Sequence, residues 1–158
     1  MRRSISLAVV GILVVACGGV GPGFTIPPIN IPSGLLPTGS GACTLVTVAE
    51  VGTIMGSAPT LTDTSDGCTF TMSNFSTVNV STEPGSDLQA SRFLFGDTAR
   101  DITIGNLPAL TGVFVGQPAV HVQRGSEQMQ VLGILTGSDD ATIAKLVQIA
   151  TIAVSRWP

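Results

Sequence analysis

Few side chains of this 158-residue chain are suited to acid–base chemistry, because it contains one histidine, one lysine and no tyrosine. His121 is the residue that a Ser-His-Asp hydrolase would use as its general base. It lies in VHVQR, an alternating pattern typical of a strand, so we expect a half-exposed polar residue. His121→Ala is then expected to lower the free energy of unfolding by less than roughly 1 kcal/mol. The GxSxG motif, which presents the nucleophile of many hydrolases, does not occur. We therefore expect no enzymatic activity and no catalytic residue.

Paired carboxylates, another acid–base arrangement, occur at Asp139-Asp140 and near Asp97 and Asp101. The first pair follows Ser138 directly ahead of a long helical pattern, a position in which acidic side chains cap a helix. The second pair falls in a stretch that favours a solvated loop. Neither pair is expected to be catalytic.

Cys17 ends an apolar segment near the amino terminus. Arg2 and Arg3 precede the apolar run ISLAVVGILVVA, and a charged start before such a run is typical of an export signal. The run is shorter than the roughly 20 residues that a membrane-spanning helix needs. The junction Val14-Val15-Ala16-Cys17 resembles the lipobox of bacterial lipoproteins, with valine at position 14 where leucine is usual. The resemblance implies cleavage before Cys17 and acylation of its thiol. The alternative is an unmodified cysteine behind a plain signal peptide.

Cys43 and Cys68 remain once Cys17 carries lipid. Exported proteins occupy compartments in which disulfides persist, so this even pair predicts a disulfide. The bond would close a loop of about 24 residues and contribute roughly 3 kcal/mol to the free energy of unfolding. A metal site would need more ligands than two thiols and His121, so we expect neither metal nor cofactor.

The composition of the chain divides it into three parts. Residues 1–16 form the signal peptide, and residues 17–42, rich in glycine and proline and without charge, form a lipidated tether. Because this tether is more apolar than a usual linker, part of it is expected to lie against the domain or against the lipid surface. Residues 43–158 have the length of a single domain.

The charge of the chain excludes one class of partner. Its formal net charge is −3, and loss of the two arginines of the signal peptide would leave −5. A mildly acidic domain with one lysine lacks the basic surface on which nucleic acids bind. We therefore expect no nucleic-acid partner.

Helical patterns occur at three places. Thr47 and Glu50 have the spacing of a capping box at the start of TVAEVGTIMG, and Gly56 fits the end of that helix. ATIAKLVQIATIAVSRW, after the paired aspartates, has apolar residues at helical spacing and predicts a C-terminal helix. SDLQASRFLF, residues 86–95, fits a helix with Ser86 as its N-cap, although its last three residues are also compatible with a strand.

Alternating patterns predict strands that pair as neighbours. CTFTMS, which begins at Cys68, and TVNVST, which begins at Thr77, are separated by a turn-prone segment. QPAVHVQRGSEQMQVLGILTG is the clearest hairpin, with its turn at Gly125-Ser126.

The stretch around Gly105, Pro108 and Gly112 is expected to be a loop. GNLPAL, residues 105–110, has a turn-like sequence that ends on apolar residues. If any loop of the domain contacts a ligand, we expect it to be this segment, with Asn106, Leu107 and Pro108 as the contact residues.

The order of these motifs is C-x-L-x-T-x-x-E-V-x-x-x-M-G, then C-T-F, then a G-x-P-A-V hairpin before a terminal helix. It resembles an uncharacterised family of bacterial lipoproteins abundant in actinobacteria, over most of residues 43–158. The resemblance implies an α+β domain with a small antiparallel sheet covered by helices, a C-terminal helix and a disulfide between the two cysteines. It implies no activity.

Three classes of function remain. The first is a membrane-anchored extracytoplasmic binding or accessory module, which holds an envelope protein, a polymer or a small apolar ligand near the membrane. The others are a structural envelope lipoprotein without a ligand and an unrecognised hydrolase. We expect the binding module. Gly18 is not the aspartate that retains lipoproteins at the inner membrane of enterobacteria, so an outer membrane, where the cell has one, also fits.

Overall fold

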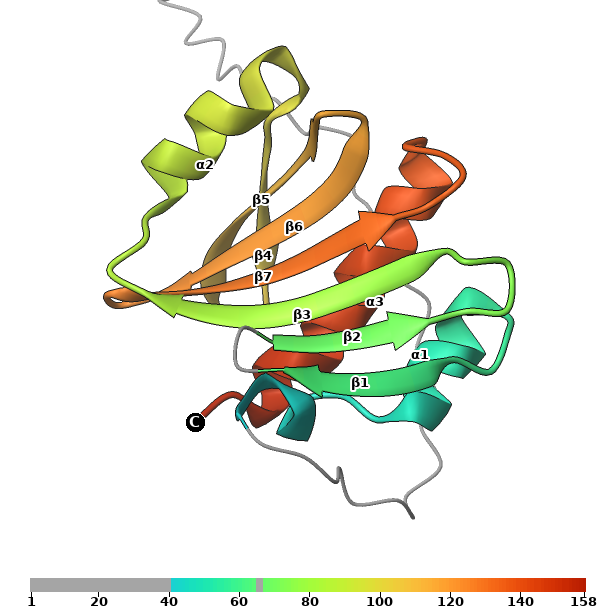
Figure 1. Ribbon diagram of the computed structural model, residues 1–158. Coiled ribbons are helices and arrows are strands. Elements are labelled where there is room, and N and C mark those ends of the chain that lie inside the picture. Colours follow the sequence, from blue (N-terminus) through green and yellow to red (C-terminus); the bar gives the residue numbers. More distant parts are fainter. Residues whose placement is uncertain (1–40, 65–66) are drawn as a thin grey trace, which may run out of the picture.

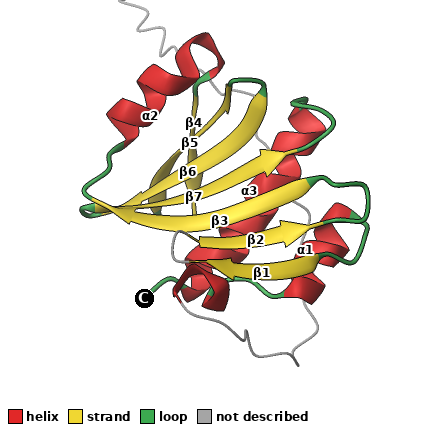
Figure 2. Ribbon diagram, viewed as in Figure 1, coloured by secondary structure: helices red, strands yellow, loops and turns green. Residues whose placement is uncertain are grey.

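A computed structural model describes residues 41–64 and 67–158. The seven strands in these residues form one antiparallel sheet (Figures 1 and 2). In chain order they are β1 (Thr60–Thr64), β2 (Gly67–Thr71), β3 (Thr77–Pro84), β4 (Arg100–Ile104), β5 (Leu107–Phe114), β6 (Gln117–Arg124) and β7 (Glu127–Ile134). Across the sheet the order is β1-β2-β3-β7-β6-β5-β4.

Three α-helices and two short 3-10 helices complete the described domain. They are η1 (Gly41–Thr44), α1 (Val48–Met55), α2 (Leu88–Phe95), η2 (Gly96–Thr98) and α3 (Asp140–Arg156). The predicted α+β class, the antiparallel sheet and the C-terminal helix are confirmed.

The two faces of the sheet have different neighbours. α3 packs on β4, β6 and β7, and α1 packs beside α3, so the long helix runs behind the sheet in Figure 1. α2 lies on the opposite face, against β5 and β6. Over β1, β2 and β3 that opposite face carries no helix from the part of the chain that the structure describes.

The main hydrophobic core lies between α3 and the sheet. Side chains alternate between the faces of a strand, so every second residue of the central strands points toward this helix. The strands contribute Val78, Val80, Val120, Val122, Met129 and Val131. The helix contributes Leu146, Ile149, Ala150 and Ala153, which share one face.

The predicted ends of two helices are confirmed. Thr47 Oγ1 accepts a hydrogen bond from Glu50 N at 3.2 Å, and Glu50 Oε2 accepts one from Thr47 N at 2.9 Å, which completes the capping box of α1. Gly56 ends that helix with φ 80°, a left-handed conformation that favours glycine. Asp139 caps α3 by accepting a hydrogen bond from Thr142 N at 2.8 Å.

A bidentate ion pair joins the start of α1 to the end of α3. Arg156 Nη1 and Nη2 donate to the Glu50 carboxylate at 2.7 and 2.6 Å, and Nη1 also donates to the Leu45 carbonyl at 3.1 Å. The Glu50 side chain is only 5% exposed. Burial alone would raise the pKa of Glu50, but hydrogen bonds from Arg156 and Thr47 and the charge of Arg156 outweigh it and lower that pKa. This carboxylate is therefore both buried and ionised.

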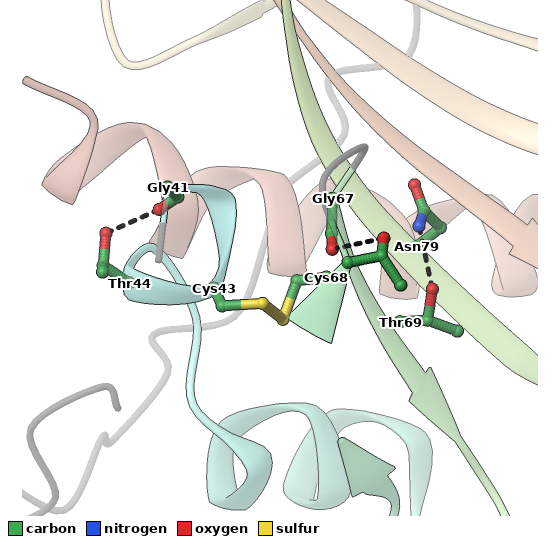
Figure 3. Close-up of a disulfide and its surroundings, with 8 residues drawn as sticks. Gly41, Cys43, Thr44, Gly67, Cys68, Thr69 and Asn79 are labelled. Atoms are coloured by element: carbon green, nitrogen blue, oxygen red, sulfur yellow. Dashed lines mark hydrogen bonds between the residues drawn. A yellow bond between two sulfur atoms is a disulfide. The ribbon is translucent and has the colours of Figure 1, made fainter. Parts of the chain in front are cut away.

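The predicted disulfide is confirmed. Cys43 of η1 is bonded to Cys68 of β2, with the two Cα atoms 4.9 Å apart, and both residues are buried in the main core. Figure 3 shows the bond between the short helix and the strand, with the Thr44 hydroxyl donating to the Gly41 carbonyl beside it. The bond fixes the first described residues of the chain against the sheet.

Loss of this disulfide is expected to lower the free energy of unfolding by roughly 3 kcal/mol, because the unfolded chain regains the freedom of the loop between the cysteines. Urea unfolding of the oxidised protein and of the Cys43→Ala/Cys68→Ala double variant measures the difference. A loss below about 1 kcal/mol, or two thiols that an alkylating reagent labels in the folded oxidised protein, would contradict it.

The sequence patterns do not predict β1, β4 or β5. β1 has a single apolar residue, Leu61, and lies at an exposed edge of the sheet, so the alternating signal is missing. The predicted loop around Gly105, Pro108 and Gly112 is wrong, because β4 and β5 form a hairpin that turns at Gly105 with φ 64°. Glycine serves the turn, not a flexible loop.

Candidate functional site

A cleft lies between α2 and the face of the sheet that α3 does not contact. Its volume is about 340 Å³. We call it the α2 cleft; its polar lining is Glu83, Ser86, Asp87, Ser91, His121, Gln128 and Gln130. Its apolar lining is Ala90, Leu94, Phe95, Phe114, Ala119 and Leu132. The residues come from α2, the segment before it and strands β3, β5, β6 and β7.

Two local features hold α2 above the sheet. Asp87, not the predicted Ser86, is the N-cap, and its carboxylate accepts a hydrogen bond from Ala90 N at 2.8 Å. At the other end Phe95 packs with Leu110 on the sheet. Gly112 makes room for it, since a Cβ there would lie 2.4 Å from ring atoms of Phe95. The predicted helix over this segment is confirmed.

His121 lies in the floor of the α2 cleft and is only 7% exposed. Its Nδ1 is 2.7 Å from Ser91 Oγ, and its ring meets Phe95 edge-on with the ring centroids 4.8 Å apart. The prediction of a half-exposed surface residue is therefore wrong. The strand alternation does place His121 on the face away from the main core, but α2 covers that face at this point.

Burial sets the charge of this histidine. It lowers the pKa of His121 to about 4, although a hydrogen bond with the Gln128 side chain acts in the opposite direction. The imidazole is therefore neutral at pH 7. In the α2 cleft it is an uncharged hydrogen-bonding group.

A serine beside a histidine is also the first pair of a hydrolase triad. Here Ser91 is only 3% exposed, and its hydroxyl is shared with Asp87 O at 3.3 Å and Gln128 Nε2 at 3.0 Å. Within the described ranges no carboxylate is hydrogen-bonded to His121. A buried serine held by three partners, beside a histidine that is a weak base, is better suited to positioning than to nucleophilic attack.

A chain of side-chain hydrogen bonds continues from Gln128 along the cleft. Gln130 Nε2 donates to Gln128 Oε1 at 3.2 Å and to Glu83 Oε2 at 2.9 Å. The Ser86 hydroxyl donates to the same carboxylate oxygen at 3.2 Å. Gln128 is only 1% exposed. Ser86 is predicted only as a helix cap, and no sequence pattern marks the other residues as a site, because glutamine and glutamate on a strand are also typical of a solvated sheet face.

A second cleft of about 310 Å³ lies where α1, β7 and α3 approach one another. Its lining includes Met72, Asn74, Asp139 and Lys145. Asp139 is occupied in capping α3: hydrogen bonds from Thr142 are the main cause that lowers its pKa. This cleft therefore offers a ligand Lys145 and small polar groups, because the Asp139 carboxylate already caps α3.

The other carboxylates singled out in the sequence have arginine partners. Asp140 accepts a hydrogen bond from Arg100 Nη1 at 2.9 Å, and Asp101 is paired with Arg92. All four side chains are well exposed, so these ion pairs contribute little to stability. Asp97 lies in η2, at the surface.

The weak ligand candidates lie apart from both clefts. Asn106 is in the turn between β4 and β5, and Leu107 and Pro108 begin β5. Neither cleft includes them in its lining. Contact with a ligand at these positions stays a prediction.

No group of three or more His, Cys, Asp or Glu side chains that could hold a metal ion occurs in residues 41–64 and 67–158. In the same ranges no helix is long and apolar enough to cross a membrane. Cys17, the predicted lipidation site, lies outside the described residues. Comparisons with protein-family models, with curated proteins and with solved structures find no significant match to this chain.

Proposed function

We propose that this chain is a membrane-anchored lipoprotein on the extracytoplasmic side of the cell envelope, and that its domain is a binding module without enzymatic activity. The observation that supports binding is the α2 cleft. Ser91, His121 and Gln128 are each more than nine-tenths buried, yet they line a cavity of about 340 Å³. Ligand sites are concave, with a few placed polar groups among apolar ones, and this cleft has that composition.

In this proposal the two faces of the sheet have different roles. Helix α3, with α1 packed beside it, lies on one face over the main hydrophobic core. On the other face α2 packs mainly on β5 and β6 and leaves a cavity beside it. A structural lipoprotein without a ligand needs only a satisfied polar face there, so the cavity favours the binding module.

The anchor rests on the Val-Val-Ala-Cys junction and on the uncharged tether behind it. Replacement of the thiol by Cys17→Ser is expected to move the protein from the membrane to the soluble fraction, or to leave it unprocessed, because no acyl chain can attach. Fractionation and labelling with palmitate measure both effects. The Cys43→Ala/Cys68→Ala variant is the matched control and should still take up label. A wild-type chain that takes up none would refute the anchor.

Binding in the α2 cleft can be tested without the anchor. Full-length protein carrying Cys17→Ser is incubated with a lipid extract of the cell envelope, and native mass spectrometry detects bound molecules. Ala90→Trp places a large side chain in the cleft and should abolish the adduct, whereas Gln89→Trp, on the same helix but outside the lining, should not. If no adduct forms, or if Ala90→Trp retains it, the structural lipoprotein takes the place of the binding module.

A further inference from the structure

The floor of the α2 cleft changes from polar to apolar along its length. In the register of the sheet Gln128 of β7 lies opposite Glu83 of β3 on one side and Gln123 of β6 on the other. Four residues further along β7, Leu132 lies opposite Ala119 of β6. Residues that are even-numbered on β7 share one face, so these side chains form one continuous floor.

The roof of the cleft has the same direction of polarity. Ser86 and Asp87, before the first turn of α2, lie at the polar end, where Gln123 Nε2 donates to the Ser86 carbonyl at 3.1 Å. Leu94 and Phe95, in the last turn, lie at the apolar end, where Phe95 packs against Ala119. Among the residues that line the cleft, those before α2 therefore lie over the polar floor, and those in its last turn lie over the apolar floor.

The apolar end is open to solvent. Leu94 is 49% exposed, and Phe114, which lines the same cleft from the end of β5, is 40% exposed. Large apolar side chains around the mouth of a cleft mark a place where an apolar group gains by leaving water.

The charges that line the cleft have one sign. Glu83 and Asp87 are carboxylates, His121 is neutral at pH 7, and no lysine or arginine of the described residues belongs to the lining. Asp87 caps α2 through Oδ1. The hydrogen bonds that Glu83 accepts from Ser86 and Gln130 both end on Oε2, and neither uses Oε1. Glu83 is exposed, so the polar end offers solvent a carboxylate with one oxygen outside these two bonds.

We propose that the α2 cleft binds an amphiphile with a positively charged, hydrogen-bond-donating head and an apolar chain. The head lies at Glu83 and Gln130, and the chain runs past Leu132 toward Leu94 and Phe114. An anionic head would enter beside two carboxylates with no cation to balance it, which opposes binding. This inference rests on the proposed binding function and adds the chemical class of the ligand.

The test uses full-length protein carrying Cys17→Ser and three probes with the same eight-carbon chain: octylammonium, octanoate and octyl glucoside. Binding is followed below micelle-forming concentrations by the ¹H–¹⁵N signals of the Gln128 and Gln130 side-chain amides. Octylammonium is expected to bind at least about tenfold more tightly than octanoate, which corresponds to about 1.4 kcal/mol. Glu83→Gln should reduce that ratio to about one or two. Glu127→Gln removes the same charge from an exposed neighbour outside the lining and should leave the ratio unchanged.

The outcomes separate this inference from the proposed function. If all three probes shift the amide signals equally and Glu83→Gln changes none of the affinities, the charge selectivity is overturned and binding in the cleft stands. If the preference for octylammonium falls equally in Glu127→Gln, it reflects the overall charge of the protein and the inference is also overturned. If no probe shifts the amides, the inference is overturned, and the lipid-extract experiment decides the proposed function.

Discussion

Arg156→Ala is expected to lower the free energy of unfolding by about 3–5 kcal/mol at pH 7, because it leaves the buried Glu50 carboxylate without its cation. Glu50 would keep its bonds from Thr47 but lose both guanidinium contacts, and the Leu45 carbonyl would lose its donor. Urea unfolding followed by circular dichroism measures the change. Since small domains have only about 5–15 kcal/mol of total stability, the variant is expected to be close to unfolding at 37 °C.

Two further variants make this prediction specific. Glu50→Gln/Arg156→Met removes both charges and should recover most of the loss, since neutral partners no longer require each other. Arg156→Lys keeps the charge but not the planar fork and should lie between wild type and Arg156→Ala. A cost of Arg156→Ala below about 1 kcal/mol, or a double variant no more stable than Arg156→Ala, would show that the ion pair does not join α1 to α3 as described.

Acid should weaken the same contact. The pKa of Glu50 is lower in the folded domain than its ordinary value of 4.5, so the unfolded chain binds the proton more readily. The contribution of the ion pair is therefore complete above that value and is lost as the pH falls through the lower, folded pKa. This loss begins only at pH values at which His121 no longer makes most of its own contribution to stability.

Local features of the fold could be predicted from the sequence because few residues determine them. A capping box depends on two side chains three positions apart, and the predicted pair Thr47 and Glu50 forms it. The turn at Gly125 depends on the residues at the tip of one hairpin. The disulfide prediction depends on the expectation that Cys17 carries lipid, which leaves Cys43 and Cys68 as one pair. Each of these predictions is independent of how distant segments meet.

Long-range contacts could not be predicted in this way. Arg156 meets Glu50 across 106 positions of the chain, and no short pattern records such a pairing. Gly112 is misread for a related reason. Its role is to leave space for Phe95 of α2, and glycine in an isolated sequence more often indicates a turn.

The candidate site shows the same division. His121 draws notice as the single histidine, and its alternating strand is predicted, but its burial depends on α2 crossing above it. Ser91 and Gln128 become notable only when the helix and the strand are brought together around that imidazole. The sequence without its fold therefore draws attention to this residue but predicts its environment wrongly.

The stability of the domain is expected to fall by about 3 kcal/mol as the pH is lowered from 6.5 to 4, because of His121 alone. The unfolded chain binds a proton on this side chain near its ordinary pKa of 6.5, whereas the folded domain does so only at about 4. Between these values the unfolded state holds more protons, so acid favours unfolding, with a slope of up to about 1.4 kcal/mol per pH unit. Well above pH 6.5 both states are neutral at this residue and the slope disappears.

Urea unfolding of the protein at pH 7.5, 6.5, 5.5 and 4.5 measures this slope, and His121 is the only histidine that contributes to it. His121→Gln cannot titrate, so its stability should be lower than that of wild type at pH 7.5 but nearly constant down to pH 5, below which carboxylates such as Glu50 take over. Its cost at pH 7.5 arises from the bond that His121 makes with Ser91 and from the packing of Phe95. A wild-type curve as flat as that of His121→Gln would mean that the imidazole is accessible to water and that α2 does not close over it.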